Sequence, residues 1–217
     1  MIYYFMGIDG SGKSSILDEI DRRLRDKNYE TLKIWARYSP FLVKIFVNIF
    51  RKRTINRSAD YHSISPEEYT AWQSNKRKIS RSPVMKQILL RSFFLDYYFQ
   101  IIRVFHRIRK NRDKIILLDR FVIDFLADQT VNFGDITDTR MYRTIISMCE
   151  RFDGIFLISV TPGTALERKN DIPGHEYLYE RDLIYRKIFK ELKKGYLIDN
   201  NGDPEIAINE ILNIIMA

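Results

Sequence analysis

Cysteine is almost absent from this sequence, and its scarcity constrains both the fold and the compartment. Cys149 is the only cysteine among the 217 residues, so no disulfide can form within the chain. A cleavable signal pattern is also lacking, because Met1 leads directly into an apolar segment and a glycine-rich loop. We therefore expect a reducing, cytoplasmic location.

Long hydrophobic runs are lacking as well. The best candidate, residues 41–50, is about half the roughly 20 residues that span a bilayer, and it contains Lys44 and Asn48. We expect no membrane span; core packing is favoured for this segment, with a membrane-surface helix as the alternative. The histidines show no metal-ligand spacing and are expected to be structural: His62, His106 and His175.

Acidic residues are scarce in the middle of the chain. Between residues 37 and 114 there are 18 Lys and Arg against 5 Asp and Glu, and the rest of the chain carries a net charge of −5. A positive segment of this kind can steer an anionic ligand, and solvated helix faces are the alternative. The basic runs at 76–81 and 107–112 accompany no recognised nucleic-acid-binding module, so solvated faces are favoured over nucleic-acid binding.

Short apolar runs alternate with segments of helical periodicity, and this alternation predicts an α/β fold with a mostly parallel sheet. The apolar runs are nearly continuous, as buried parallel strands are. Strands are predicted at 2–8, 32–36, 115–119, 155–160 and 196–199. Helices are predicted at 14–27, 84–109, 139–151, 176–194 and 204–216.

Residues 37–113 separate the second predicted strand from the third, which is far more chain than one crossover connection needs. No linker rich in Gly and Ser bounds this stretch. We therefore predict a helical insert within one domain that spans residues 1–217. The 45% of hydrophobic residues is sufficient for a sizeable core.

The most specific motif is GIDGSGKS at residues 7–14, which matches G-x-x-x-x-G-K-[ST] between a predicted strand and a predicted helix. The glycines allow a tight turn whose backbone N–H groups bind phosphate oxygens, and the helix N-terminus adds its positive dipole end. Lys13 supplies a charge for the β- and γ-phosphates, and the Ser14 hydroxyl suits Mg²⁺. The motif predicts binding of ATP and Mg²⁺ through Gly7, Asp9, Gly10, Ser11, Gly12, Lys13, Ser14 and Ser15.

A second acidic site lies in the segment KIILLDR at residues 114–120. An apolar strand that ends in Asp119 would hold a carboxylate for Mg²⁺ at the carboxyl edge of the sheet. Arg120 could bind an acceptor phosphate bidentately; a surface pair at a strand end is the alternative for both residues. Asp9 is interpreted as reaching toward the acceptor, with a turn-forming role as its alternative.

These motifs belong to a wider pattern, because the chain resembles the thymidylate kinase family of nucleoside monophosphate kinases over most of its length. The resemblance rests on FMGIDGSGKSS (5–15), LLDRF (117–121), ISVTPGTALERK (158–169) and YLIDNNGDPEIAINEI (196–211). It implies a P-loop three-layer α/β/α fold with a five-stranded parallel sheet, an acceptor-binding insert at 37–113 and a lid at 161–178. It also implies a homodimer that transfers the ATP γ-phosphoryl group to a nucleoside monophosphate, with dTMP as the expected acceptor.

The resemblance also implies roles for individual residues. On the acceptor side, Asp9 would lie near the sugar, Arg37 and Arg120 near the acceptor phosphate, and Phe93 against the base. On the ATP side, the lid would begin at Arg168 and Lys169, and adenine would be bordered by Asn200 and Asn201. The expected catalytic residues are Lys13, Asp9, Arg120 and Arg168.

The chain differs from the family pattern on the acceptor side. Tyr97 stands where the family usually has an arginine that contacts the base, and Phe121 and Asp124 replace a tyrosine and a serine. Tyr97 and Asp124 therefore join the candidate acceptor-binding residues. Two alternatives stay open: a kinase of the same fold that acts on another monophosphate, a nucleoside or a sugar, and a nucleotide-dependent nucleic-acid-binding protein.

Overall fold

The computed structural model describes residues 1–44, 82–169 and 174–217. One sheet of five parallel strands has the order β2-β3-β1-β4-β5. The strands are β1 (Ile2–Met6), β2 (Thr31–Trp35), β3 (Ile115–Asp119), β4 (Gly154–Ser159) and β5 (Gly195–Asp199). The basic run at 76–81, His62 and parts of the predicted insert and lid lie outside the described residues.

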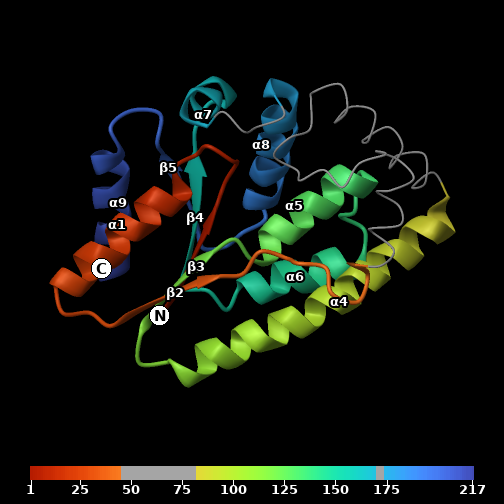
Figure 1. Cartoon of the computed structure of the whole chain (residues 1–217), viewed down its shortest axis with the longest axis horizontal. Coiled ribbons are helices and arrows are strands. Elements are labelled where there is room, and N and C mark those ends of the chain that lie inside the picture. The colour runs from red at the N-terminus through yellow and green to blue at the C-terminus, as the bar shows by residue number, and fades with distance from the viewer. Residues whose placement is uncertain (45–81, 170–173) are drawn as a thin grey trace.

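Helices cover both faces of the sheet, which gives the predicted three-layer α/β/α architecture (Figure 1). One face carries α1 (Lys13–Asp26) and α9 (Pro204–Met216). The other face carries α4 (Pro83–Lys110), α5 (Val122–Phe133), α6 (Arg140–Cys149) and α8 (His175–Phe189). The short helix α7 (Pro162–Arg168) follows β4 at the carboxyl edge of the sheet.

The central strands are buried on both faces because their side chains alternate between two hydrophobic clusters. In β1, Tyr3 and Phe5 pack in the cluster beneath α1 and α9, whereas Tyr4 and Met6 pack in the cluster beneath α4, α5, α6 and α8. This period-two alternation is the strand geometry that buries a continuous apolar run. The carboxyl ends of β1, β3 and β4 are thereby fixed at one edge.

The edge strands are less buried than the sequence predicted. Trp35 of β2 is 66% exposed and Leu197 of β5 is 51% exposed, while the neighbouring Ile198 is fully buried. The prediction that 32–36 and 196–199 are buried throughout was therefore wrong. A strand at the edge of a sheet has one neighbouring strand, so its flank and part of its faces stay in contact with solvent.

The predicted helices are confirmed, with ends shifted by up to five residues. Two of them begin with recognisable caps: the side chain of Ser82 accepts a hydrogen bond from the Met85 N–H at 3.4 Å, and Asp203 accepts one from Glu205 at 2.9 Å. Proline follows directly in both helices, where its missing N–H has no intrahelical partner to lose. Helices α5 and α7 were not predicted.

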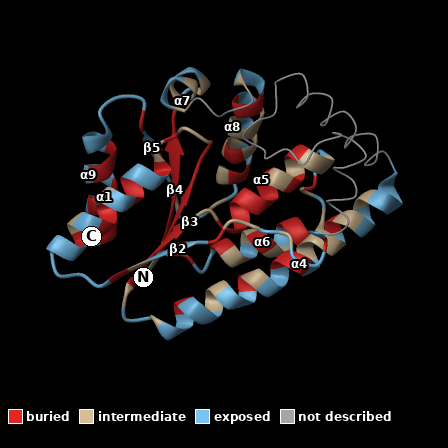
Figure 2. Cartoon of the chain, viewed as in Figure 1, coloured by how far each residue is buried: buried red, intermediate tan, exposed pale blue. Residues whose placement is uncertain are grey.

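The exposed faces lie on the outer helices (Figure 2). Within the described ranges, no helix is both long and apolar enough to cross a membrane. The outer side of α4 is exposed along much of its length, including Ile88, Leu95, Phe99 and Ile102.

Candidate functional site

The glycine-rich loop connects β1 to α1 at the carboxyl edge of the sheet. Gly10 and Gly12 have φ values of 80° and 83°, a region that favours glycine. A Cβ atom on Gly10 would lie 2.4 Å from the carbonyl oxygen of Ala165, and one on Gly12 would lie 2.7 Å from the Asn200 side-chain nitrogen. The loop is thus enclosed by α7 and by the segment after β5.

Lys13 places its ammonium group inside this loop. Its Nζ atom donates hydrogen bonds to the carbonyl oxygens of Gly7 and Ile8, both at 2.6 Å, and to Ser11 Oγ at 3.2 Å. Burial lowers the pKa of Lys13 to about 8; Arg120 adds to this effect and Asp9 opposes it. These hydrogen bonds hold the ammonium group within the loop that would bind phosphate. A bound anion would stabilise its charged form.

Ser14 and Asp119 lie together, as a magnesium site requires. The Ser14 hydroxyl donates to Asp119 Oδ2 at 3.2 Å. Among the described residues, Asp119 Oδ1 is buried without a hydrogen-bond partner. Burial raises the pKa of Asp119, and Lys13 and Arg120 act against that rise. A hydroxyl and a carboxylate with one unused oxygen are the hard oxygen ligands that Mg²⁺ prefers, so these residues fit the ion.

Asp9 and Arg120 form an ion pair beside the loop. Arg120 follows directly after β3 with a φ of 55° and donates from Nη2 to Asp9 Oδ1. Tyr177 of α8 donates to the other Asp9 oxygen at 2.9 Å. Burial alone would raise the pKa of Asp9, but the charges of Arg120, Lys13 and Arg181 hold it well below its usual range. Asp9 is therefore ionised and already has partners for both oxygens.

Arg181 and Asp128 extend this charged cluster, and the sequence did not identify either residue. Arg181 of α8 pairs with Asp128 of α5 at 2.7 Å, and its guanidinium lies 4.6 Å from the ring centroid of Tyr177. Burial works against the charge of Arg181, yet Tyr177, Asp128 and Tyr185 raise its pKa above the ordinary value. No local motif marks these residues, because they meet only when α8 packs on α5.

Asp124 lies behind Arg120 and is buried. Its carboxylate accepts hydrogen bonds from the hydroxyls of Tyr4 and Tyr185, the latter at 2.7 Å, and from the Phe121 N–H at 3.1 Å. Arg120 Nη1 lies 3.8 Å from Asp124 Oδ1. Asp124 is 3% exposed, so as placed its carboxylate offers little surface to an acceptor.

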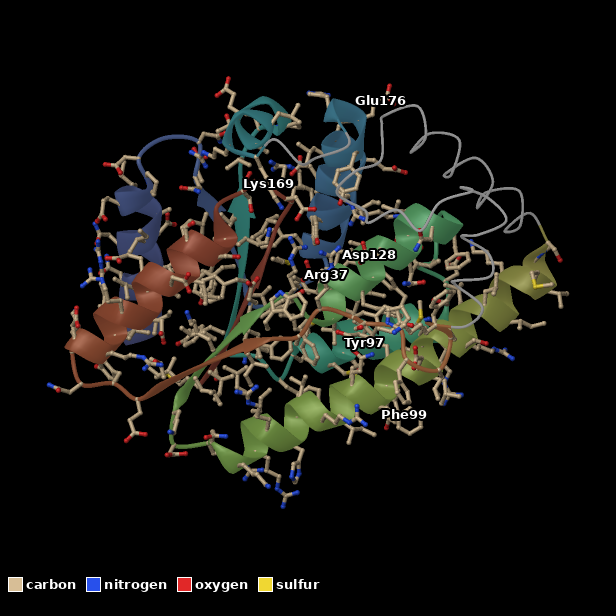
Figure 3. The ribbon with its side chains drawn as sticks, in the orientation of Figure 1. Arg37, Tyr97, Phe99, Asp128, Lys169 and Glu176 are labelled. Atoms are coloured by element: carbon tan, nitrogen blue, oxygen red, sulfur yellow. The ribbon has the colours of Figure 1, made fainter. Side chains whose placement is uncertain are left out.

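The expected lid residues begin next to the glycine-rich loop. Arg168, at the end of α7, donates to the Asn200 carbonyl oxygen at 2.8 Å, and the Asn200 side chain donates to the Ser11 carbonyl oxygen at 2.8 Å. Asn201 is exposed and accepts from the Thr161 N–H at 2.7 Å. Lys169 follows α7 and is half-buried (Figure 3). Ser15 is exposed in the first turn of α1.

The expected acceptor residues are only partly brought together. The Ala36 N–H donates to the carbonyl oxygens of Asp119 and Arg120, at 3.1 and 3.2 Å, so Arg37 starts beside these residues and is half-buried. Phe93 is half-buried among aromatic rings, and its ring centroid lies 6.3 Å from that of Tyr38. Tyr97 is fully buried, and its ring stacks on that of Phe125 with the centroids 4.4 Å apart. Its side chain points inward from α4, whereas that of Phe99 points outward (Figure 3). As placed, Tyr97 offers no surface to an acceptor.

Comparison with known proteins identifies the fold. No protein-family model matches the chain. Deoxyadenosine kinase from M. mycoides with bound dATP aligns with a TM-score of 0.52 and 18% identity, covering 100% of both chains. A second structure of that enzyme, with the products dCMP and a flexible dCDP, has a TM-score of 0.48 and 18% identity, covering 100% of this chain and 99% of the other. The chain thus has a P-loop kinase-like α/β fold, similar in structure to deoxyadenosine kinase.

Proposed function

We propose that this chain is a phosphotransferase that uses ATP and Mg²⁺. One observation carries the proposal: the Lys13 ammonium lies within the glycine-rich loop while Ser14 and the half-paired Asp119 lie together. The loop amides and Lys13 would bind the β- and γ-phosphates, and Ser14 and Asp119 would hold the metal. When bound, Mg²⁺ would neutralise charge on the phosphates.

The acceptor that we propose is a nucleoside monophosphate, with dTMP as the substrate that the sequence resemblance favours. Its phosphate would be placed by Arg120 and Arg37, which start side by side at the ends of β3 and β2. The acceptor oxygen would attack the γ-phosphorus in line, so the protein needs no nucleophile of its own. Arg120 and Lys13 would stabilise the negative charge of the transition state, because their cationic groups would already be in place before the reaction.

The expected lid and insert complete this proposal. Arg168 and Lys169 would act on the ATP phosphates from the segment 161–178, and Asn201 would border the adenine. The hydrogen bonds from Arg168 to Asn200 and from Asn200 to Ser11 of the glycine-rich loop support this role for Arg168. The segment 37–113 would carry the acceptor, with Phe93 against the base.

A nucleoside is the second candidate acceptor, and the pairing of the site arginines favours it. Arg120 is bound to Asp9, and Arg181 is bound to Asp128. Two arginines with carboxylate partners have less positive charge to offer a second phosphate, and an ionised Asp9 could accept the proton of an attacking hydroxyl. The similar structure with bound dATP is that of a deoxyadenosine kinase.

An ADP-release assay over a panel of acceptors separates these candidates. The panel contains dTMP, dUMP, UMP, CMP, thymidine and deoxyadenosine, with a reaction that lacks acceptor as the control. Under the proposed function, dTMP gives the highest kcat/KM and the nucleosides give rates near the control. Higher activity with a nucleoside would replace the first candidate by the second. Release of no ADP above the control with any acceptor would contradict both.

We also propose a homodimer, as the resemblance implies, and a cytoplasmic location, as the single cysteine and the lack of a signal pattern indicate. The described part of α4 leaves a row of large apolar side chains exposed on one helix, spaced so that they share a face: Val84, Ile88, Leu95, Phe99 and Ile102. A second copy of the chain is the partner that this proposal assigns to the row.

A further inference from the structure

A cavity of about 420 Å³ lies at the amino edge of the sheet, where β1 and β3 begin. The glycine-rich loop lies at the opposite edge, after β1 ends. A strand of five residues spans about 15 Å, so the cavity is separate from the candidate site. Its walls come from the last turns of α4, the segment that leads into β3, and the segment between α6 and β4.

The rim of this cavity carries an excess of positive charge. Arg109, Arg112 and Arg151 line it, and all are exposed. Within the described part of the chain, none of these arginines has an ion pair with a carboxylate. The lining residues include one carboxylate, that of Asp153, which accepts a hydrogen bond from the Ile2 N–H at 2.7 Å and is outnumbered by the arginines. The rim therefore offers several guanidinium groups to an anion.

The floor of the same cavity is apolar and includes an aromatic ring. Ile108 and Ile116 are 6% and 1% exposed and belong to the core beneath α4. Phe105 is half-buried; its ring meets Phe121 edge to face, and the Arg151 guanidinium lies 5.5 Å from its ring centroid. A cation already placed against an aromatic ring forms a surface on which a flat ring can stack.

We propose that this cavity is a second binding site, which takes a free mononucleotide. The phosphates would bind Arg109 and Arg112 through bidentate hydrogen bonds, and the base would lie against Phe105 and Arg151. The volume is in the usual range for small-molecule sites, about 300–1,000 Å³. An inorganic anion would use the rim alone and leave the apolar floor uncovered. The inference goes beyond the proposed function, because binding here requires no phosphoryl transfer.

The test uses ADP as the probe, and the substitution Lys13→Ala weakens nucleotide binding at the glycine-rich loop. Isothermal titration calorimetry of Lys13→Ala should still show one ADP site. Adding Arg109→Gln and Arg112→Gln should weaken that site at least about tenfold, because two charge-assisted contacts are removed. The matched control adds Arg103→Gln and Arg107→Gln, which remove the same charge from exposed positions of α4 outside the cavity. The control should change the dissociation constant by less than about twofold.

A second variant tests the floor. Phe105→Leu keeps an apolar side chain, so it should weaken ADP binding while leaving the affinity for inorganic pyrophosphate unchanged. Thermal unfolding of each variant confirms that it folds.

Several results would overturn the proposal. They are no ADP binding in Lys13→Ala, equal losses in the two double-arginine variants, or pyrophosphate binding as tightly as ADP. Tighter binding of a single-stranded oligonucleotide than of ADP would point to nucleic acid instead. Phosphoryl transfer by the unmodified protein is measured separately, so this inference and the proposed function can fail independently.

Discussion

At the scale of single residues, Lys13 is buried, yet its side chain would have to be protonated to bind the phosphates of Mg·ATP. Burial lowers its pKa to about 8, whereas bound phosphates would favour the protonated form. Affinity for Mg·ATP should therefore fall as pH rises past that value, by about tenfold between about pH 7.5 and about pH 9. Calorimetric titration with Mg·ATP across this range measures the effect.

The control for this pH dependence is Lys13→Arg, because arginine stays protonated throughout the range. Its affinity for Mg·ATP, whatever its absolute value, should be constant with pH. The same linkage acts on folding: unfolded chains bind a proton at Lys13 that the folded protein has released above about pH 8, so this residue makes the free energy of unfolding rise with pH. An affinity of the unmodified protein that does not change up to about pH 9 would contradict the placement of Lys13.

The ion pair between Asp9 and Arg120 gives a prediction about stability. Both side chains are mostly buried, so Asp9→Asn leaves a buried guanidinium with less compensation and should lower the free energy of unfolding by about 2–4 kcal/mol at neutral pH. The pKa of Asp9 is depressed. The stability that this ion pair contributes is therefore complete above the pKa of Asp9 in the unfolded chain, about 3.9, and is lost as pH falls below it.

Urea denaturation at neutral pH and at about pH 3 measures this difference. The matched control is Asp18→Asn, which breaks an ion pair between Asp18 and Lys33 whose side chains are 66% and 38% exposed. That loss should stay below about 1 kcal/mol. Equal losses in the two variants would show that Asp9 and Arg120 are not a buried pair in solution.

Local sequence could predict some of the residues that gather here and not others. Lys13 and Ser14 belong to a contiguous motif, and Asp119 and Arg120 follow an apolar strand, so their neighbourhood follows from two local patterns and the topology of parallel strands. Tyr177, Arg181 and Asp128 reach the site through the packing of α8 on α5. No spacing in the sequence encodes that contact. The burial of Tyr97 likewise depends on stacking against a helix that was not predicted.

At the scale of elements, α7 and the glycine-rich loop are packed so closely that one Cβ atom would disturb them. Gly10→Ala would place a Cβ 2.4 Å from the Ala165 carbonyl oxygen at a φ of 80°. It should lower the free energy of unfolding by about 1–3 kcal/mol and weaken ATP binding. Gly163→Ala, within α7, meets nothing closer than 3.8 Å. It should be neutral or stabilising by up to about 1 kcal/mol.

Thermal or chemical unfolding of these two glycine variants checks the packing of α7. If Gly10→Ala were as stable as Gly163→Ala and bound ATP equally well, α7 would not rest on the loop as the structure describes.

The sequence predicted a helix or a strand correctly wherever its apolar residues repeat with a clear helical or strand period. The central strands read as continuous apolar runs because both of their faces are covered, and α1 carries its apolar residues on one face. Helix α5 was missed because most of its residues are buried, including Asp124 and Gln129, so no polar face marks it as a helix. The exposure of β5 depends on its place at the edge of the sheet, which one strand's sequence does not reveal.

At the scale of the whole molecule, the exposed apolar row on α4 tests the proposed homodimer. Phe99 is 49% exposed, so Phe99→Glu should have little effect on the fold of one chain but should place charges inside an interface that buries this row. Light scattering coupled to size-exclusion chromatography should then show a monomer. Arg107→Glu, an exposed position on another side of the same helix, is the control for the added negative charge and should leave the dimer intact. A protein that is monomeric without any substitution would rule out the proposed assembly.

The proposed function requires that the segment 7–14 holds the phosphates of ATP for transfer to an acceptor. The most direct measurement follows the label from ATP that carries a radioactive γ-phosphate, in a mixture of dTMP, thymidine and deoxyadenosine. We expect the label to move to an acceptor with the unmodified protein, and Lys13→Ala to lower the rate by about 10²-fold or more while remaining folded. Transfer at an undiminished rate by Lys13→Ala, or no transfer by the unmodified protein, would contradict this role of the glycine-rich loop.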